Sequence, residues 1–331
     1  PLPLDDVLAG GEIDPPPALL ARNDGRHLLY RGAVHTISGE PGSGKTWLAL
    51  EAARQELADG EHVTMIDFED RASRVVGRLL ALGATPDAIR DRFHYIRPHS
   101  PIDAATSATL VTLVSGSTLV ILDGVTEAMT LHGYDLHSNA DIASFYHLLP
   151  RTLADAGPAV GMIDHVVKDS EKQGRWAIGG QHKLAGIDGV AYLVKAIEEF
   201  GRGKLGHARI TVSKDRPGYV EEIALGRTVA ELWLDARNDD YVKAELKAPE
   251  SIVDDSTGQL RPTHLMEKVS RFIEITPGCL ARTITETNLG RKQYVRTALA
   301  NLIREGYVEV ETGPHRAQFH RSIRPYREAE E

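Results

Sequence analysis

The residues with the most specific chemistry are the eight from Gly39 to Thr46, which read GEPGSGKT. Their spacing matches G-x-x-x-x-G-K-[ST], the pattern of a loop that holds the phosphates of a nucleotide. Glycines let such a loop fold closely, so that its N–H groups point at an anion. We therefore expect a nucleoside-triphosphate site formed by Gly39, Glu40, Pro41, Gly42, Ser43, Gly44, Lys45 and Thr46.

Two side chains of this loop have separate expected roles. The Lys45 ammonium would reach the β- and γ-phosphates, and the Thr46 hydroxyl would bind Mg²⁺. A second carboxylate is needed near the metal, and the apolar run 118–122 ends in Asp123. The sequence therefore predicts ATP and Mg²⁺ as ligands, with Thr46 and Asp123 on the metal side.

The loop also has the flanking elements that the motif requires. A short apolar strand is predicted over 33–38, directly before the loop, and a helix over 46–57, directly after it. The start of a helix carries unpaired N–H groups and a favourable dipole for an anion. A loop between a strand and a helix is thus suited to bind phosphate.

A further pair of carboxylates, Glu69 and Asp70, follows the predicted strand 62–68, and Glu69 stands 24 residues after Lys45. This arrangement resembles RecA-like ATPases, in which the glutamate activates the attacking water. The segment IDFEDRASRVVGRLLALG resembles the plasmid RepA-like hexameric helicases, with DnaB-type helicases more distant. The resemblance implies that Glu69 is catalytic. Hydrolysis independently requires an acceptor that orients water, and Asp67 and Asp70 are left as structural or capping residues.

The resemblance extends to two further elements of the site. Asp164 and His165 follow the predicted strand 160–163, at its C-terminal end. The related families carry a sensor of the γ-phosphate at this place, which implies that role for His165. The run ARITVSKDRPG resembles the K-x-R-x-G element of DnaB-type helicases, which implies that Lys214 and Arg216 reach the nucleotide of a neighbouring subunit. A surface salt bridge is the alternative for these two residues. If the resemblance holds, the active form is a ring, with a hexamer expected.

The polar segment 168–183 follows the sensor strand, at the place where RecA-like motors carry loops that contact DNA. Its cations are candidates for contacts with DNA phosphates, since cations supply most of the non-specific affinity for DNA. A solvated loop is the alternative. The candidates are Lys168, Lys172, Arg175 and Lys183.

The last seventy residues differ in pattern from the rest. Helices are predicted over 264–275, 280–287 and 290–305, followed by strands over 307–311 and 317–323. This order resembles a winged helix-turn-helix, whose third helix contacts the major groove, although such units also bind proteins. The candidate DNA contacts on that helix are Arg291, Lys292, Tyr294 and Arg296.

These patterns predict how the chain is divided. Alternating strands and helices predict an α/β fold with a largely parallel sheet, here the RecA-like P-loop NTPase fold. Later strands over 229–234 and 241–246 are expected as antiparallel additions at an edge. The expected parts are an N-terminal arm (1–30), an ATPase domain (31–247), a linker (248–262) and a winged-helix domain (263–326).

Composition narrows the class of protein. The net charge of −9 argues against a surface that is basic throughout, but residues 261–331 carry 12 Lys and Arg against 9 Asp and Glu. A basic module on an acidic core fits a local DNA contact. One cysteine, Cys279, excludes an intramolecular disulfide, and no apolar run is long enough to span a bilayer, so a cytoplasmic location is expected.

The sequence alone favours an ATP-dependent DNA motor, most simply a ring-forming replicative helicase of a phage or plasmid. Two other functions stay open. RecA-like ATPases include recombination mediators and switches that unwind nothing, and these would hydrolyse ATP slowly without responding to DNA. The second open function is that of a DNA-binding regulator. In such a protein ATP sets the oligomeric state and the winged helix binds a duplex site.

Overall fold

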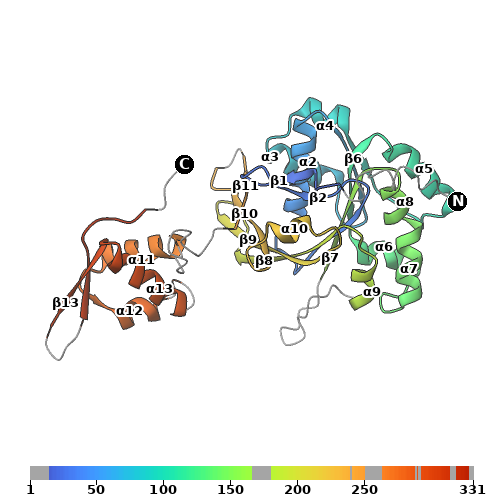
Figure 1. The fold of residues 1–331 in the computed structure, drawn as a ribbon. Coiled ribbons are helices and arrows are strands. Elements are labelled where there is room, and N and C mark those ends of the chain that lie inside the picture. Colours follow the sequence, from blue (N-terminus) through green and yellow to red (C-terminus); the bar gives the residue numbers. More distant parts are fainter. Residues whose placement is uncertain are drawn as a thin grey trace. The chain divides into compact units, whose positions relative to one another are not determined.

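The computed structural model describes residues 15–165, 180–238, 241–249, 263–287, 289, 292–313 and 318–327. The chain divides into two compact units, Pro1–Pro249 and Glu250–Glu331. Figure 1 shows the first unit as a sheet with helices on both faces and the second as a small bundle of helices beside a hairpin. No helix within the described ranges has the length and apolar character needed to cross a membrane.

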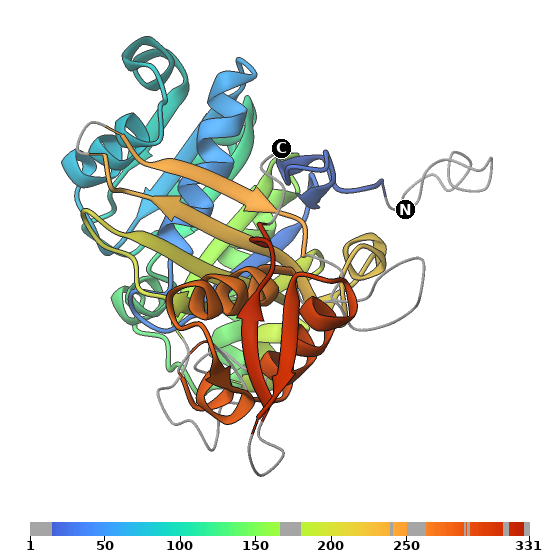
Figure 2. The ribbon, with the colours of Figure 1, turned by 90° about the vertical axis from the view of Figure 1, so that its left-hand side faces the viewer.

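The first unit is built on a large sheet, for which the described residues supply nine strands in the order β11-β10-β9-β8-β3-β7-β6-β4-β5. The strands from β8 to β5 in this order are parallel, and β9, β10 and β11 add antiparallel strands at one end, seen in Figure 2. The predictions of a largely parallel α/β sheet and of antiparallel additions are thus confirmed. The strands are β3 (Val34–Gly39), β4 (His62–Asp67), β5 (Phe93–Ile96), β6 (Ser117–Asp123), β7 (Ala159–His165), β8 (Val190–Glu198), β9 (Leu205–Asp215), β10 (Thr228–Asp235) and β11 (Lys243–Lys247).

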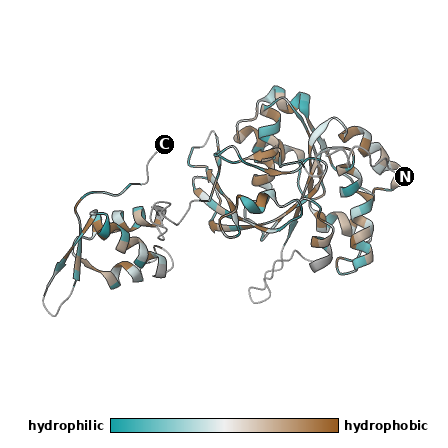
Figure 3. Ribbon diagram, in the orientation of Figure 1, coloured by the Kyte–Doolittle hydropathy of each residue, from teal (hydrophilic) through white to brown (hydrophobic). Residues whose placement is uncertain are grey.

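The helices cover the two faces of this sheet and enclose two hydrophobic clusters. Side chains alternate along β6, so that Leu119 and Ile121 join one cluster while Val120 and Leu122 join the other. Hydrophobic residues accordingly concentrate on the strands in Figure 3. The first cluster receives α2 (Lys45–Ala58), α3 (Ala72–Ala81) and α4 (Pro86–Arg92), and the second receives α5 (Ala104–Val114), α6 (Val125–Leu131), α7 (Asn139–Leu148) and α8 (Pro150–Ala154).

Two helices, and not one continuous helix, precede β7. Pro150 has no N–H to donate and disfavours the helical conformation of the residue before it. Leu149 accordingly leaves the helical region, with φ −128° and ψ −74°, and α7 ends there while α8 begins at Pro150. The described part of this unit also contains two short helices, α9 (Gly180–Ala185) and α10 (Tyr219–Glu222).

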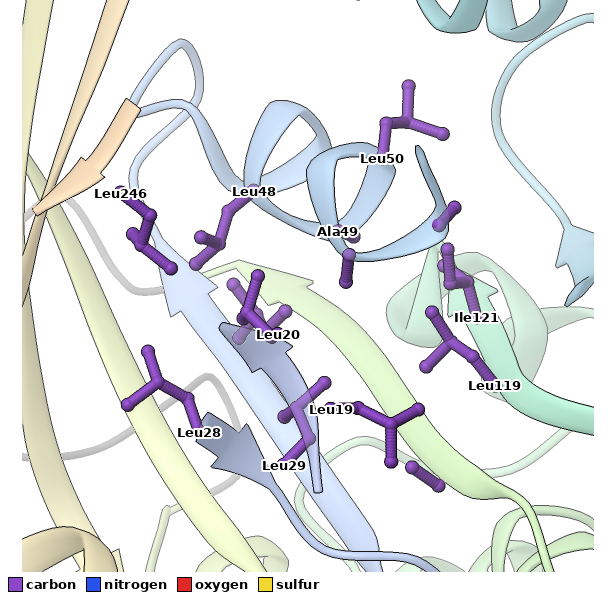
Figure 4. Packing of buried hydrophobic residues seen from close by; sticks show 14 of the residues in the cluster. Leu19, Leu20, Leu28, Leu29, Leu48, Ala49, Leu50, Leu119, Ile121 and Leu246 are labelled. Carbon is purple, nitrogen blue, oxygen red and sulfur yellow. The ribbon is translucent and has the colours of Figure 1, made fainter. Parts of the chain in front are cut away.

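The expectation of an N-terminal arm over residues 1–30 is wrong for residues 19–30. They form an antiparallel hairpin of β1 (Leu19–Ala21) and β2 (His27–Leu29), whose leucines are buried in the first cluster beside Leu48 and Leu246 (Figure 4). Gln55 of α2 accepts a hydrogen bond from the Ala21 N–H at 2.7 Å and donates one to the Ala21 carbonyl at 3.1 Å. Burial of four leucines stabilises this hairpin, so these residues are part of the first unit and not an arm.

The second unit has its own core. Its helices are α11 (Thr263–Ile275), α12 (Ala281–Glu286) and α13 (Lys292–Arg304), and its strands are β12 (Cys279–Leu280), β13 (Val308–Thr312) and β14 (Gln318–Ser322). The strands pair antiparallel in the order β12-β14-β13. Met266, Val269, Ile284, Val295 and Leu302 are buried together beneath them. Most of the expected linker 248–262 lies outside the described residues.

Candidate nucleotide-binding site

The loop from Gly39 to Gly44 leaves the end of β3 and enters α2 through two glycines in the left-handed region. Gly42 has φ +78° and Gly44 has φ +97°, values that side chains with a Cβ rarely adopt. Gly39 is restricted by space instead, because a Cβ there would lie 2.4 Å from the Val194 carbonyl oxygen. The backbone therefore turns tightly above the sheet and leads directly into the first N–H groups of α2.

Lys45 lies inside this loop. Its Nζ donates to the carbonyl oxygens of Gly39 and Glu40, both at 2.9 Å. Burial lowers the pKa of Lys45, and the negative charges of Asp123, Glu69, Asp164 and Glu40 oppose that shift. The ammonium is held at the mouth of the loop, the position from which a lysine contacts phosphate oxygens.

Thr46 and Asp123, the two residues expected to bind Mg²⁺, are neighbours in the structure. Thr46 Oγ1 donates to Asp123 Oδ2 at 3.4 Å. The pKa of Asp123 is raised to about 7, first by burial and then by Asp67 and Glu69, while Thr46 and Lys45 oppose the shift. Asp67 and Asp123 are paired in register at the ends of β4 and β6. Several carboxylates converging here create a demand for positive charge that a cation would satisfy.

Glu69 and His165 face each other across the site. His165 Nε2 lies 3.6 Å from Glu69 Oε2, and its Nδ1 lies 3.5 Å from Lys45 Nζ. The strand register explains why His165 is close to Lys45, because His165 at the end of β7 is paired with Gly39 at the end of β3, where the phosphate-binding loop begins. The Glu69 side chain is 48% exposed, so its carboxylate is open to water as well as to His165.

Asp67 and Asp70 have the structural contacts expected of them. Asp67 Oδ1 accepts from the N–H groups of Glu69 and Asp70, both at 2.8 Å, and its Oδ2 accepts from Tyr95 Oη at 3.0 Å. Asp70 forms ion pairs with Arg74 and Arg78 on α3 at 3.2 and 3.1 Å. The turn that carries Glu69 is therefore held by Asp67 from below.

A cleft of about 1310 Å³ contains this site and extends well beyond it. Its lining includes side chains that no motif indicated, among them Trp47, Phe200 and Tyr241. Phe200 lies in the connection between β8 and β9, and a Cβ on Gly44 would come within 2.6 Å of its ring. Only the close approach of two segments 156 residues apart brings Phe200 to the loop, so sequence spacing carries no signal for it.

Lys214 and Arg216 lie at the other end of the strands from the phosphate-binding loop. Val194 of β8 is level with Gly39, whereas Val190 of β8 pairs with Asp215. Lys214 Nζ donates to the carbonyl oxygen of Leu184 at 2.9 Å and to that of Ile187. Arg216 is exposed, and its guanidinium has no hydrogen-bond or ion-pair partner within the described part of the chain.

The candidate DNA contacts fall into three groups: residues outside the described ranges, one buried residue and three exposed residues. Lys168, Lys172, Arg175 and Arg291 lie outside the described residues. Lys183 does not present its charge to solvent, which corrects the expectation for this residue: its side chain is 3% exposed and pairs with Asp164 at 2.8 Å. Lys292, Tyr294 and Arg296 are exposed on the first turns of α13.

The residues fit a magnesium nucleotide. Ser43 Oγ is buried and, within the described residues, has no hydrogen-bond partner, which leaves it available to a ligand of the loop. No group of three or more His, Cys, Asp or Glu side chains in the described ranges could hold a metal by itself. Mg²⁺ commonly takes one or two protein groups and completes its shell with phosphate oxygens and water, which matches Thr46 and Asp123.

Comparisons with known proteins agree with this geometry. A model of an AAA domain family matches residues 1–171, more than half of the chain. The DNA repair protein RadA of Mycolicibacterium smegmatis is 26% identical over 226 residues, which are 66% of this chain and 41% of RadA. The chain therefore spans less than half the length of that relative. With its mostly parallel sheet and its GEPGSGKT loop, which fit a RecA-like P-loop NTPase, this chain belongs to the AAA domain family of P-loop ATPases.

Proposed function

We propose that the protein is an ATP- and Mg²⁺-dependent ATPase that acts on DNA as an oligomer and completes its active site between subunits. The supporting observation is the place of Arg216. Four strand residues separate the level of Val190 from that of Val194, which is about 13 Å along the sheet. Arg216 lies beyond the lower end of that span, so it would serve the nucleotide of a neighbouring chain.

In this proposal the residues of one chain bind and orient the nucleotide. Lys45 contacts the phosphates, Glu69 orients the attacking water, and His165 senses the γ-phosphate, each of which suits its position at the carboxyl end of the parallel strands. Arg216 of the adjacent chain would then stabilise the charge that develops on the transferred phosphoryl group. Lys214 would join it only after leaving the carbonyl oxygens that it binds in the single chain.

DNA is the proposed partner for three reasons. Three cations, Lys168, Lys172 and Arg175, follow the strand that ends at His165. The similar protein RadA is a DNA repair protein. The described part of the second unit has three helices and an antiparallel hairpin, an order that resembles a winged helix-turn-helix, and it exposes Lys292, Tyr294 and Arg296 on its third helix.

The more specific form of this proposal is a ring-forming replicative helicase, with six subunits as in the RepA-like and DnaB-type families. A recombination or repair ATPase that does not unwind DNA uses the same site chemistry, and the similarity to RadA favours it. A forked-duplex unwinding assay separates the two forms.

The decisive experiment measures ATP hydrolysis with and without single-stranded DNA, with Lys45→Ala as the blank. We expect stimulation of about tenfold or more in the wild type and none in the blank, because bound DNA would favour the arrangement of subunits that completes the active site. A wild-type rate that does not respond to DNA would overturn the DNA-acting part of the proposal in favour of a switch.

A mixing experiment tests the shared site. Lys45→Ala and Arg216→Ala are each expected to be inactive alone. When they are mixed, some boundaries pair an intact Lys45 with an intact Arg216 from the adjacent chain, so the mixture should regain about a quarter of the wild-type rate if subunits mix at random. A mixture no more active than its components would exclude catalysis across the boundary.

A further inference from the structure

A buried ion pair connects the end of β7 with α9. Lys183 on α9 donates to Asp164 Oδ2 at 2.8 Å, and both side chains are 3% exposed. Asp164 immediately precedes His165 in β7, so the pair fixes α9 against the residue next to His165. Such a pair gains little net stability, since desolvation of both charges offsets their attraction. Its geometry therefore matters more than its contribution to the folding free energy.

The second oxygen of Asp164 connects two more parts of the site. Asp164 Oδ1 accepts from the backbone N–H of His165 at 2.9 Å and from Thr126 Oγ1 at 3.3 Å. Thr126 is in the first turn of α6, three residues after Asp123. One carboxylate thus contacts the backbone of the sensor residue, the helix that follows Asp123, and α9. A change in its position would move all three.

The C-terminal end of α9, next to Lys183, has a second contact. Lys214 Nζ donates to the carbonyl oxygens of Leu184 and Ile187, at the C-terminal end of α9 and just beyond it. Lys214 belongs to β9, two residues before Arg216. α9 is therefore fixed between β7, which ends at His165, and β9, which leads to Arg216.

We propose that Lys183 is a positioning residue: through Asp164 it holds the backbone of His165 and so places the imidazole against Lys45 and Glu69. The proposal rests on the proposed role of His165 as a sensor of the γ-phosphate. Lys183 itself is buried and does not line the nucleotide cleft. Its loss should therefore weaken recognition of the γ-phosphate while leaving the contacts with the diphosphate in place.

The test compares two dissociation constants in the full chain, those of Mg²⁺–ADP and of a Mg²⁺-bound non-hydrolysable ATP analogue with an imido β–γ bridge. Lys183→Met is expected to weaken binding of the analogue by about tenfold, the loss that accompanies a misplaced charge-assisted hydrogen bond. Binding of ADP should stay within about twofold of the wild type. Lys183→Arg keeps the charge, so its dissociation constant for the analogue should be close to that of the wild type.

Lys195→Met is the matched control, because Lys195 is an exposed lysine on β8 that does not line the cleft. It should leave both dissociation constants unchanged. The double variant D164N/K183M removes the uncompensated buried charge that K183M leaves behind. It should recover the Tm lost by K183M while the analogue stays weakly bound, since the contact from position 183 that fixes the side chain at position 164 is still missing.

Two results would overturn the proposal. One is an unchanged ratio of the two dissociation constants in K183M, and the other is recovery of that ratio along with the Tm in the double variant, which would make the pair structural only. The ratio does not depend on the fraction of unfolded protein. It is also measured without DNA, so a wild type that ignores DNA would sink the proposed function without deciding this inference.

Discussion

His165 Nε2 lies 3.6 Å from Glu69 Oε2, although the two residues are 96 positions apart in the chain. They come from the ends of β7 and β4, two parallel strands whose carboxyl ends lie at the same edge of the sheet. The contact places the proposed water-orienting group beside the proposed γ-phosphate sensor.

Glu69→Gln should lower kcat by about a hundredfold or more while nucleotide affinity stays nearly unchanged. The amide keeps the shape of the side chain but does not accept a proton from water, and Glu69 does not hold the phosphate-binding loop. Steady-state ATP hydrolysis and a separate ADP binding measurement check this. Asp70→Asn is the control, since Asp70 is paired with Arg74 and Arg78, and a comparable loss there would argue against a special role for Glu69.

Binding of Mg²⁺–ADP near pH 6.5 should release protons from the protein. The pKa of Asp123 is raised to about 7 mainly by burial, so the carboxyl is largely protonated at that pH. A bound cation favours the ionised form and lowers the pKa. Calorimetry in two buffers of different ionisation enthalpy measures the release, which should be smaller when Mg²⁺ is omitted. Identical heats in both buffers would contradict the prediction.

The buried imidazole of His35 should make stability fall as the pH falls. Its pKa is lowered from 6.5 to about 4 by burial, so the folded state stays neutral while the unfolded state gains a proton below pH 6.5. The contribution is complete above that pH and decreases toward pH 4, by about 2 kcal/mol between pH 7 and 5. The raised pKa of Asp123 acts in the opposite direction, because its contribution is complete below pH 4 and is lost as the pH rises through about 7.

The effect of His35 must therefore be measured as a difference. The Tm of the wild type should exceed that of His35→Gln at pH 7, and the gap should narrow as the pH is lowered to 5. Asp123 contributes equally to both proteins and cancels. A gap that stays constant across this range would mean that His35 titrates alike in the folded and unfolded states.

Leu29→Ala should lower the free energy of unfolding by about 2–5 kcal/mol, as expected for a buried leucine whose removal leaves a cavity. Leu29 is 1% exposed in the first hydrophobic cluster. Leu113→Ala is the matched control, since Leu113 is 57% exposed and should cost less than about 0.5 kcal/mol. Denaturant unfolding compares the two. Equal losses of stability in the two variants would mean that the hairpin does not contribute to the core.

Several features of the site followed from local sequence. The phosphate-binding loop was predictable because its conformation depends on glycines at fixed spacing, and Gly42 and Gly44 do adopt positive φ. Asp123 was predictable because it ends a short, continuously apolar strand, and such strands are buried in parallel sheets with their carboxyl ends together. Short-range rules of this kind need no knowledge of the partner segment.

Other features depended on contacts between distant segments. Local sequence made residues 19–30 part of an arm and Lys183 a DNA contact, yet the hairpin packs on Leu48 and Leu246 and Lys183 pairs with Asp164. A pattern of residue types shows whether a side chain prefers burial, but it does not name its partner or the register of its strand. Glycine spacing and strand ends thus determined the nucleotide site from the sequence alone. Only the packed sheet decided that Lys183 is buried and that Arg216 lies at the far end from the loop, because both follow from strand register and long-range pairing.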